Sequence, residues 1–224
     1  MSSFSRVLSD YQTQDDRMTN WQPKAWGLVT IPFTHSVRLM ATEGRLLDNL
    51  ARDRGLSGLS DFKDVHDQAF DVSKARYPDP ATVPDYVGSG ARDRRTWMQN
   101  DGQRDAFRHA YWSAMLTKNF GGEWARQFTT AHEGAPGNPA DREAMDLYNN
   151  EVGRQIALAN PHASDAQLAD LVQKAVSEGK MVVIDSGGNL QWGDRVPYGQ
   201  HGKANDPPAT GGNPLPDGNA SADS

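Results

Sequence analysis

The chain has 224 residues, of which 37% are hydrophobic, and it contains no cysteine. This length suits one hydrophobic core of ordinary size, and the lack of cysteine excludes disulfides, thiolate metal sites and a cysteine nucleophile. The net charge of −6 argues against a general basic surface for nucleic acid, so we expect no nucleic-acid partner.

We expect three parts along the chain. Residues 1–22 form a polar segment without the apolar core of a signal peptide, and residues 23–196 form a single helical domain. Residues 197–224, rich in Gly, Pro and Asp, predict a disordered tail. No run of about eighteen apolar residues occurs, so we expect a protein made in soluble form in the cytoplasm, with no transmembrane segment. Action outside the cell would require a secretion system that reads no signal peptide.

The first half of the domain predicts two helices and a long connection. Apolar residues at helical spacing indicate a helix over 36–54 that ends at Gly55, and a second helix from Ser60 to Tyr77. Residues 78–102 hold several prolines and glycines and predict an irregular connection, which at this length is usually functional or mobile.

The second half predicts four more helices, separated by Gly, Pro and Asn, over residues 103–119, 122–133, 139–159 and 164–179. A small β-hairpin is expected to follow, with its strands at 181–184 and 189–192 on either side of an Asp-Ser-Gly-Gly turn. The expected fold class is therefore mainly α, a bundle of about five to six helices with a small C-terminal hairpin and a disordered tail.

Two of these helices carry a polar stripe at the spacing i, i+3, i+4, i+7, which places its members on one helix face. The first stripe consists of Asp105, Arg108, His109 and Trp112, and the second of Asp146, Asn149, Asn150 and Gly153. The helix between them ends in His132-Glu133. If the three helices pack as an up-down bundle, the stripes converge on one pocket within the core motif region 101–192.

The residue types at this pocket suggest their chemistry, because imidazole and carboxylate groups move protons and guanidinium groups hold anions. The catalytic candidates are His109, His132, Glu133, Asp146, Arg108 and Asp105, and the substrate-binding candidates are Trp112, Asn149, Asn150 and Arg154. A divalent metal ion is a candidate cofactor, with His109, His132, Glu133 and Asp146 as its candidate ligands. In the alternative, these groups form surface ion pairs or a satisfied structural network.

Three segments, Arg108-His109-Ala110-Tyr111-Trp112, Ala131-His132-Glu133 and residues 145–154, resemble a bacterial domain family of unknown function. Its members share an Arg-His-Ala helix with a following Trp, a His-Glu pair and an Asn-Asn-x-x-Gly-Arg helix. The resemblance covers roughly residues 101–192. Such domains occur in proteins that look secreted or toxin-like, which implies an effector that acts on a bacterial envelope and has a cognate immunity or secretion partner.

A second likeness is to the metal-dependent phosphohydrolases of the His-Asp superfamily, whose His, His-Asp pair and later Asp match the order of His109, His132-Glu133 and Asp146. Glu133 stands where that family has Asp, so its two-metal geometry does not carry over directly.

Three functions remain open. The first is a toxin or effector-type hydrolase of an envelope component, either a lipid ester or phosphoester or peptidoglycan. The second is a metal-dependent phosphohydrolase of soluble substrates, for which Arg108 and the loop around Arg92–Arg95 would hold phosphate. The third is a non-catalytic binding module. The sequence leaves the oligomeric state open.

Overall fold

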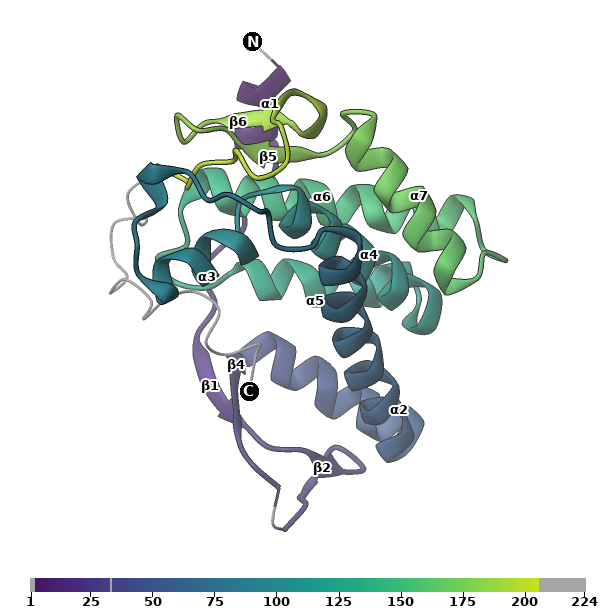
Figure 1. Ribbon diagram of the computed structural model, residues 1–224. Coiled ribbons are helices and arrows are strands. Elements are labelled where there is room, and N and C mark those ends of the chain that lie inside the picture. Colours follow the sequence, from purple (N-terminus) through teal and green to yellow (C-terminus); the bar gives the residue numbers. More distant parts are fainter. Residues whose placement is uncertain (1–2, 33, 206–224) are drawn as a thin grey trace.

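The computed structural model describes residues 3–32 and 34–205 and is organised around the helix α4 (Gln103–Phe120). Four other helices pack against α4, as Figure 1 shows: α2 (Ala41–Arg76), α5 (Gly122–Glu133), α6 (Ala140–Ala159) and α7 (Asp165–Ser177). Every residue of α4 from Gln103 to Thr117 is buried. Polar side chains on this helix must therefore find their partners inside the protein.

The mainly α fold class is confirmed, with seven α-helices in the described part of the chain. The helices expected over 103–119, 122–133, 139–159 and 164–179 match α4 to α7 to within a few residues. Ser164 starts α7 with the expected capping box, because its hydroxyl accepts the N–H of Gln167 and the Gln167 side chain accepts the N–H of Ser164.

The helix α2 differs from the two helices expected in this region. The chain does change direction at Gly55, whose φ of 68° interrupts the helical backbone, but helical structure resumes at once rather than near Ser60. The expected start at Ser36 is wrong, because Val37–Met40 form the strand β4. This strand pairs in antiparallel fashion with β1 (Met18–Trp21), and α2 begins only at Ala41.

Residues 78–102 contain two helical segments, the 3-10 turn η1 (Asp85–Val87) and the helix α3 (Ala91–Gln99). Trp97 of α3 is buried, and its ring stacks on His201 at 4.3 Å between centroids. Residues 197–205 therefore pack against the domain, and the expected tail cannot begin at residue 197. The rest of the predicted tail, residues 206–224, lies outside the described residues.

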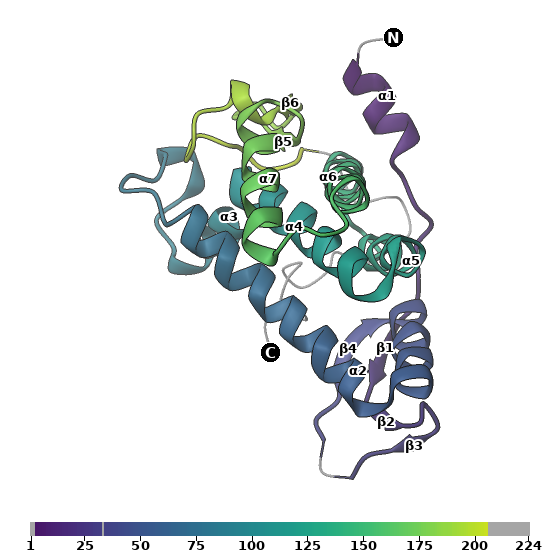
Figure 2. The same ribbon diagram turned by 90° about the vertical axis from the view of Figure 1, so that its right-hand side faces the viewer.

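Two small hairpins and a helix complete the fold. The C-terminal hairpin is present as expected, as β5 (Val182–Ile184) pairs with β6 (Leu190–Trp192), which the turn η2 (Gly193–Arg195) follows. A second hairpin joins β2 (Lys24–Ala25) to β3 (Val29–Thr30) at the opposite end of the molecule (Figures 1 and 2). The N-terminal helix α1 (Ser3–Asp10) packs on α6. No helix within the described ranges has the length and apolarity to cross a membrane.

Candidate functional site

The close crossing of α4 and α6 brings the two predicted polar stripes together. Gly153 of α6 lies directly against the backbone of α4, where an added Cβ would stand 1.9 Å from the carbonyl oxygen of Ala110. Only glycine permits this approach, so the sequence of α6 itself sets the distance between the helices. Asp146, two turns before Gly153, is thereby placed beside His109 of α4.

His109 stands at the centre of a buried cluster of three carboxylates. Its Nε2 atom lies 3.2 Å from Oδ1 of Asp105 and 3.6 Å from Oδ1 of Asp146. Its Nδ1 atom lies 3.2 Å from Oε1 of Glu133 at the end of α5, an ion-pair contact without hydrogen-bond geometry. All four residues are buried. Side chains from three successive helices therefore meet in one buried cluster.

The second predicted histidine, His132, lies beside this cluster and has a carboxylate of its own. Its Nδ1 is 2.9 Å from Oε1 of Glu43 in the first turn of α2, and its ring centroid is 6.4 Å from that of His109. The other oxygen of Glu43 accepts the backbone N–H of Met40. With 29% of its side chain exposed, His132 is more accessible to solvent than His109, whose side chain is 7% exposed.

The surroundings shift the pKa values of the cluster in opposite directions. Burial raises the pKa of Asp146 well above its ordinary value, and the nearby Asp105 and Glu133 add to this effect. Burial opposes the imidazolium form of His109, but Asp146, Glu133 and Asp105 together raise its pKa well above the usual value. For Asp105 the effect of burial is outweighed by Arg108 and His109, which lower its pKa. Divergent shifts of this kind occur at functional sites and also in buried structural ion-pair networks.

Three of the predicted substrate-binding residues, Asn149, Arg154 and Trp112, lie outside the group of carboxylates around His109. Both polar atoms of the Asn149 amide bond to the backbone of Val182, so this side chain holds β5 in place. Arg154 pairs with Glu151 of its own helix. Trp112 packs edge-on against the ring of His132 at 5.0 Å. These three contacts give Asn149 and Arg154 no place in the cluster, whereas Trp112 borders it.

Asn150 and Arg108 do contact the cluster. The amide of Asn150 donates to Oε1 of Glu133, and its own oxygen has no hydrogen-bond partner among the described residues. Arg108 donates to Oδ1 of Asp105 and to the carbonyl of Gln99, with its guanidinium 4.7 Å from the ring centre of Phe70. Arg108 thus neutralises Asp105, whereas the sequence suggested that its guanidinium would hold an anionic group of a substrate.

Three charged residues near the site were not anticipated from the sequence. One of them is Glu43. The other two, Asp101 and Arg142, form an ion pair in which Nε and Nη2 of Arg142 donate to the two carboxylate oxygens of Asp101 at 2.8 and 2.7 Å. Asp101 has a φ of 70°, and its N–H donates to Asp105 of α4. Because its side chain also binds Arg142, the turn before α4 is connected to α6. In the sequence, the only hint of this contact is the Asn-Asp-Gly stretch that contains Asp101.

Glu143 is a further acidic neighbour, and we expect Glu143→Gln to stabilise the protein in a pH-dependent way. Burial raises the pKa of Glu143 to about 7, so the folded protein favours the protonated carboxyl. The wild type should therefore lose stability as the pH rises from about 4.5 through about 7, whereas a glutamine stays neutral and can still accept the N–H of Thr13. The variant should be more stable by about 1–3 kcal/mol near pH 8 and equal near pH 4. Denaturant unfolding at both pH values measures this difference.

The control for this prediction is Glu123→Gln. Glu123 is exposed and its hydrogen bonds to Arg126 and Gln127 lower its pKa to about 2, so its replacement should give no gain at high pH. An equal gain in both variants would mean that net charge, rather than the burial of Glu143, controls the pH dependence.

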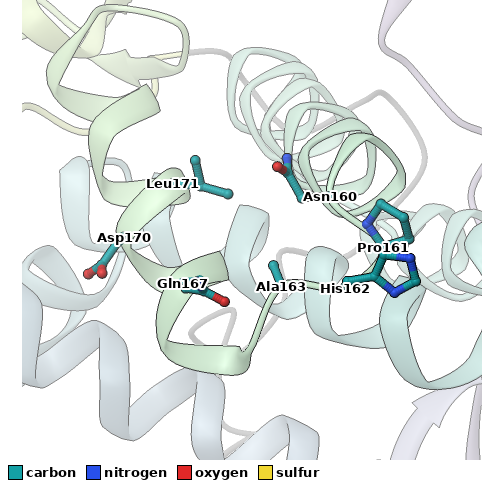
Figure 3. A pocket seen from close by; sticks show the side chains of 7 residues that line it. All are labelled: Asn160, Pro161, His162, Ala163, Gln167, Asp170 and Leu171. Carbon is teal, nitrogen blue, oxygen red and sulfur yellow. The ribbon is translucent and has the colours of Figure 1, made fainter.

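Two open hollows on the surface of the described residues lie away from the cluster. One, of about 550 Å³, lies between the loop at residues 160–163 and α7, where Asn160, His162 and Gln167 border it (Figure 3). Another, of about 280 Å³, lies among α2, α4 and α5 and is bordered by Trp124 and Phe120. Neither contains a predicted site residue.

Comparison with known proteins places the cluster in a family. A family profile described as a domain of unknown function, DUF6973, matches residues 61–180, which include α4 to α7 and thus His109, Glu133 and Asp146. The match begins and ends earlier than the region 101–192 on which the sequence resemblance rests. No curated protein and no solved structure matches the chain. More than half of the sequence is covered, and the chain therefore belongs to the DUF6973 family of domains of unknown function.

Proposed function

We propose that this protein is a hydrolase that depends on a divalent metal ion held by Asp105, His109 and Asp146. The observation that carries the proposal is the convergence of these three residues. One ligand atom from each, two carboxylate oxygens and a ring nitrogen, lies within 4.8 Å of the others, and all three side chains are buried. One imidazole and two carboxylates form a ligand set suited to Zn²⁺, Mn²⁺ or Mg²⁺.

The hydrogen bonding of Asp146 supports a cation at this position. Its Oδ1 atom is buried and has no hydrogen-bond partner among the described residues. A buried carboxylate without a partner is strongly disfavoured, and the surplus of carboxylates over cations around His109 makes it more so. A divalent ion would neutralise Asp146 and would add a second cation beside Asp105, which already pairs with Arg108. It would also remove the need for Asp146 to be protonated.

The two nitrogens of the His109 ring support the same assignment. Nε2 is directed at the two aspartates, while Nδ1 lies on the side of Glu133. Histidines that bind metals commonly have a carboxylate on the ring nitrogen that faces away from the ion, where it fixes the tautomer and raises ligand basicity. Glu133 is therefore assigned a positioning role, with Asn150 orienting its carboxylate.

The other residues complete the chemistry of a hydrolase. A bound divalent ion would supply an activated water and polarise a carbonyl or phosphoryl oxygen. His132, held by Glu43 at the more exposed side of the cluster, is placed to exchange a proton with a reacting group that approaches from there. Trp112 would form an apolar wall beside it. For the substrate, the family resemblance favours an ester, phosphoester or peptidoglycan of the bacterial envelope.

The test is the uptake of metal by the full chain. Protein treated with a chelator and then exposed separately to Zn²⁺, Mn²⁺ and Mg²⁺ should retain about one equivalent of a favoured ion. At about 100 times the dissociation constant, the ion should stabilise the fold by ~2.7 kcal/mol, a rise of roughly 5–10 °C in Tm for a chain of this size. Asp146→Asn and His109→Gln should lose both the ion and the rise in Tm.

His132→Gln is the matched control, because His132 is near the cluster but outside the set of three ligands. It should keep the ion and lose activity. The loaded wild type is then assayed on a lipid phosphoester, a lipid ester, peptidoglycan and a soluble phosphomonoester. Cleavage of the soluble substrate alone would contradict the envelope substrate. If the wild type retains no ion at all, the metal proposal is wrong, and the cluster serves as a structural or binding network.

A further inference from the structure

Large apolar side chains are exposed at one small region of the surface. In the loop and strand after β2, Trp26 is 69% exposed, Leu28 is 74% exposed and Val29 is 60% exposed. Single exposed apolar residues are common on soluble proteins, but a cluster within four consecutive positions indicates a binding surface. Figures 1 and 2 show this hairpin projecting from the end of the molecule opposite β5 and β6. We call residues 24–30 the hairpin tip.

The hairpin tip is fixed to α2 rather than loosely attached. Lys24 forms an ion pair with Asp48, and the other oxygen of Asp48 accepts the indole N–H of Trp21. Gly27 is buried against α2, where a Cβ would stand 2.2 Å from the carbonyl oxygen of Asp48. The apolar side chains on either side of Gly27 are consequently presented outward by a rigid support.

The backbone of the tip also departs from what a large side chain prefers. Trp26 has a φ of 51°, a conformation that bulky residues rarely adopt. Gly or Asn would fit this turn with less strain. A tryptophan that is both strained and exposed contributes little to the folded core, so its place is better explained by an interaction outside the chain.

The charge around the tip differs from that of the whole protein. Residues 18–56 contain five basic and three acidic residues, although the chain as a whole has 23 basic and 29 acidic residues. Arg45 and Arg52 are exposed and lie two turns apart on the face of α2 that meets the hairpin. Arg52 is in van der Waals range of the position that a Cβ on Gly27 would take, at 3.5 Å.

We propose that the hairpin tip inserts into the interface of a lipid bilayer with anionic headgroups. A projecting apolar tip needs no complementary pocket in a bilayer, whereas a protein partner would have to supply one. Tryptophan favours the boundary between headgroups and acyl chains, and basic residues beside it attract anionic lipid. The tip shares no residue with the metal cluster, so this docking is independent of the proposed hydrolase activity.

Co-sedimentation of the full chain with vesicles tests the proposal. The wild type should bind vesicles of phosphatidylcholine with phosphatidylglycerol, and bind pure phosphatidylcholine much more weakly. Leu28→Ser should weaken binding to the anionic vesicles by about tenfold or more, the loss expected when a buried leucine is removed from an apolar phase. Arg45→Gln combined with Arg52→Gln should weaken binding at low salt and make the remaining binding less sensitive to added salt than that of the wild type. The tryptophan fluorescence of the wild type should shift to the blue on binding, and Trp26→Phe should remove that shift while keeping binding.

The matched control is Leu158→Ser, which removes another exposed leucine (54%) from α6, outside the tip. It should bind as the wild type does. Equal binding by the Leu28 and Leu158 variants, or no binding to anionic vesicles, would overturn the proposal. Sedimentation velocity without lipid adds a separate outcome, because a dimer that Leu28→Ser dissociates would assign the tip to a second copy of the chain instead.

Discussion

Gly153→Ala is expected to destabilise the protein by about 3 kcal/mol or more, although helix propensity alone would favour the change by about 1 kcal/mol. The new methyl group would meet three backbone atoms of Ala110, the nearest at 1.9 Å, and the backbone of a buried helix cannot move aside as a flexible side chain would. The helices α4 and α6 would have to separate, and Asp146 would move away from His109. Thermal unfolding should show a Tm lower by roughly 6–12 °C.

Gly122→Ala is the appropriate control for this change. Gly122 is also a helical residue, but a Cβ there would meet only the side chain of Leu158 at 3.4 Å, an ordinary contact. That variant should be neutral or slightly stabilised. A Gly153 variant more stable than the wild type would mean that the two helices do not approach as described, and that the site between them is not formed.

His109→Ala, without added metal, is expected to cost about 3–5 kcal/mol of stability, because breaking a buried charge cluster leaves uncompensated carboxylates. Asp146 is the member with the fewest other contacts, since Arg108 still neutralises Asp105 and Asn150 still donates to Glu133. Adding Asp146→Asn to His109→Ala should therefore restore part of the lost stability. Asp146→Asn alone should be neutral or stabilising while it abolishes metal uptake.

A double-mutant cycle measured by denaturant unfolding gives the coupling between His109 and Asp146. A distant carboxylate, Glu178, provides the comparison, because its change to glutamine combined with His109→Ala should restore nothing. Additive losses in both cycles would contradict a shared electrostatic role for His109 and Asp146.

The sequence predicts well those features that depend on local spacing. The four helices of the second half and the C-terminal hairpin follow from apolar periodicity and from Gly and Pro at their ends, and each is present. The convergence of Asp105, His109 and Asp146 follows from the same spacing combined with an up-down arrangement of helices. Gly153 indicates where the two helices approach each other, because a glycine inside a polar stripe suggests a close helix crossing.

Other parts of the site depend on contacts between distant residues. Glu43 lies 89 positions before its partner His132, and nothing in the local pattern around Glu43 distinguishes it from a surface acid. The same holds for His201, which stacks on Trp97 from a segment with the composition of a tail. The bonds of Asn149 to the backbone of Val182 are equally hard to foresee, because an amide that bonds to a strand backbone and an amide that bonds to a substrate have the same appearance in a helix stripe.

The amide of Asn149 also bears on how the domain can be excised. Its two polar atoms bond to the backbone N–H and carbonyl of Val182 in β5, as a neighbouring strand would. Val182 lies beyond residue 180, the last residue matched by the family profile. A fragment limited to residues 61–180 would leave this amide buried without a partner and would also separate His132 from Glu43. The cooperative folding unit is therefore larger than the region by which the family is recognised, and reaches from the strand before α2 to the segment that carries His201.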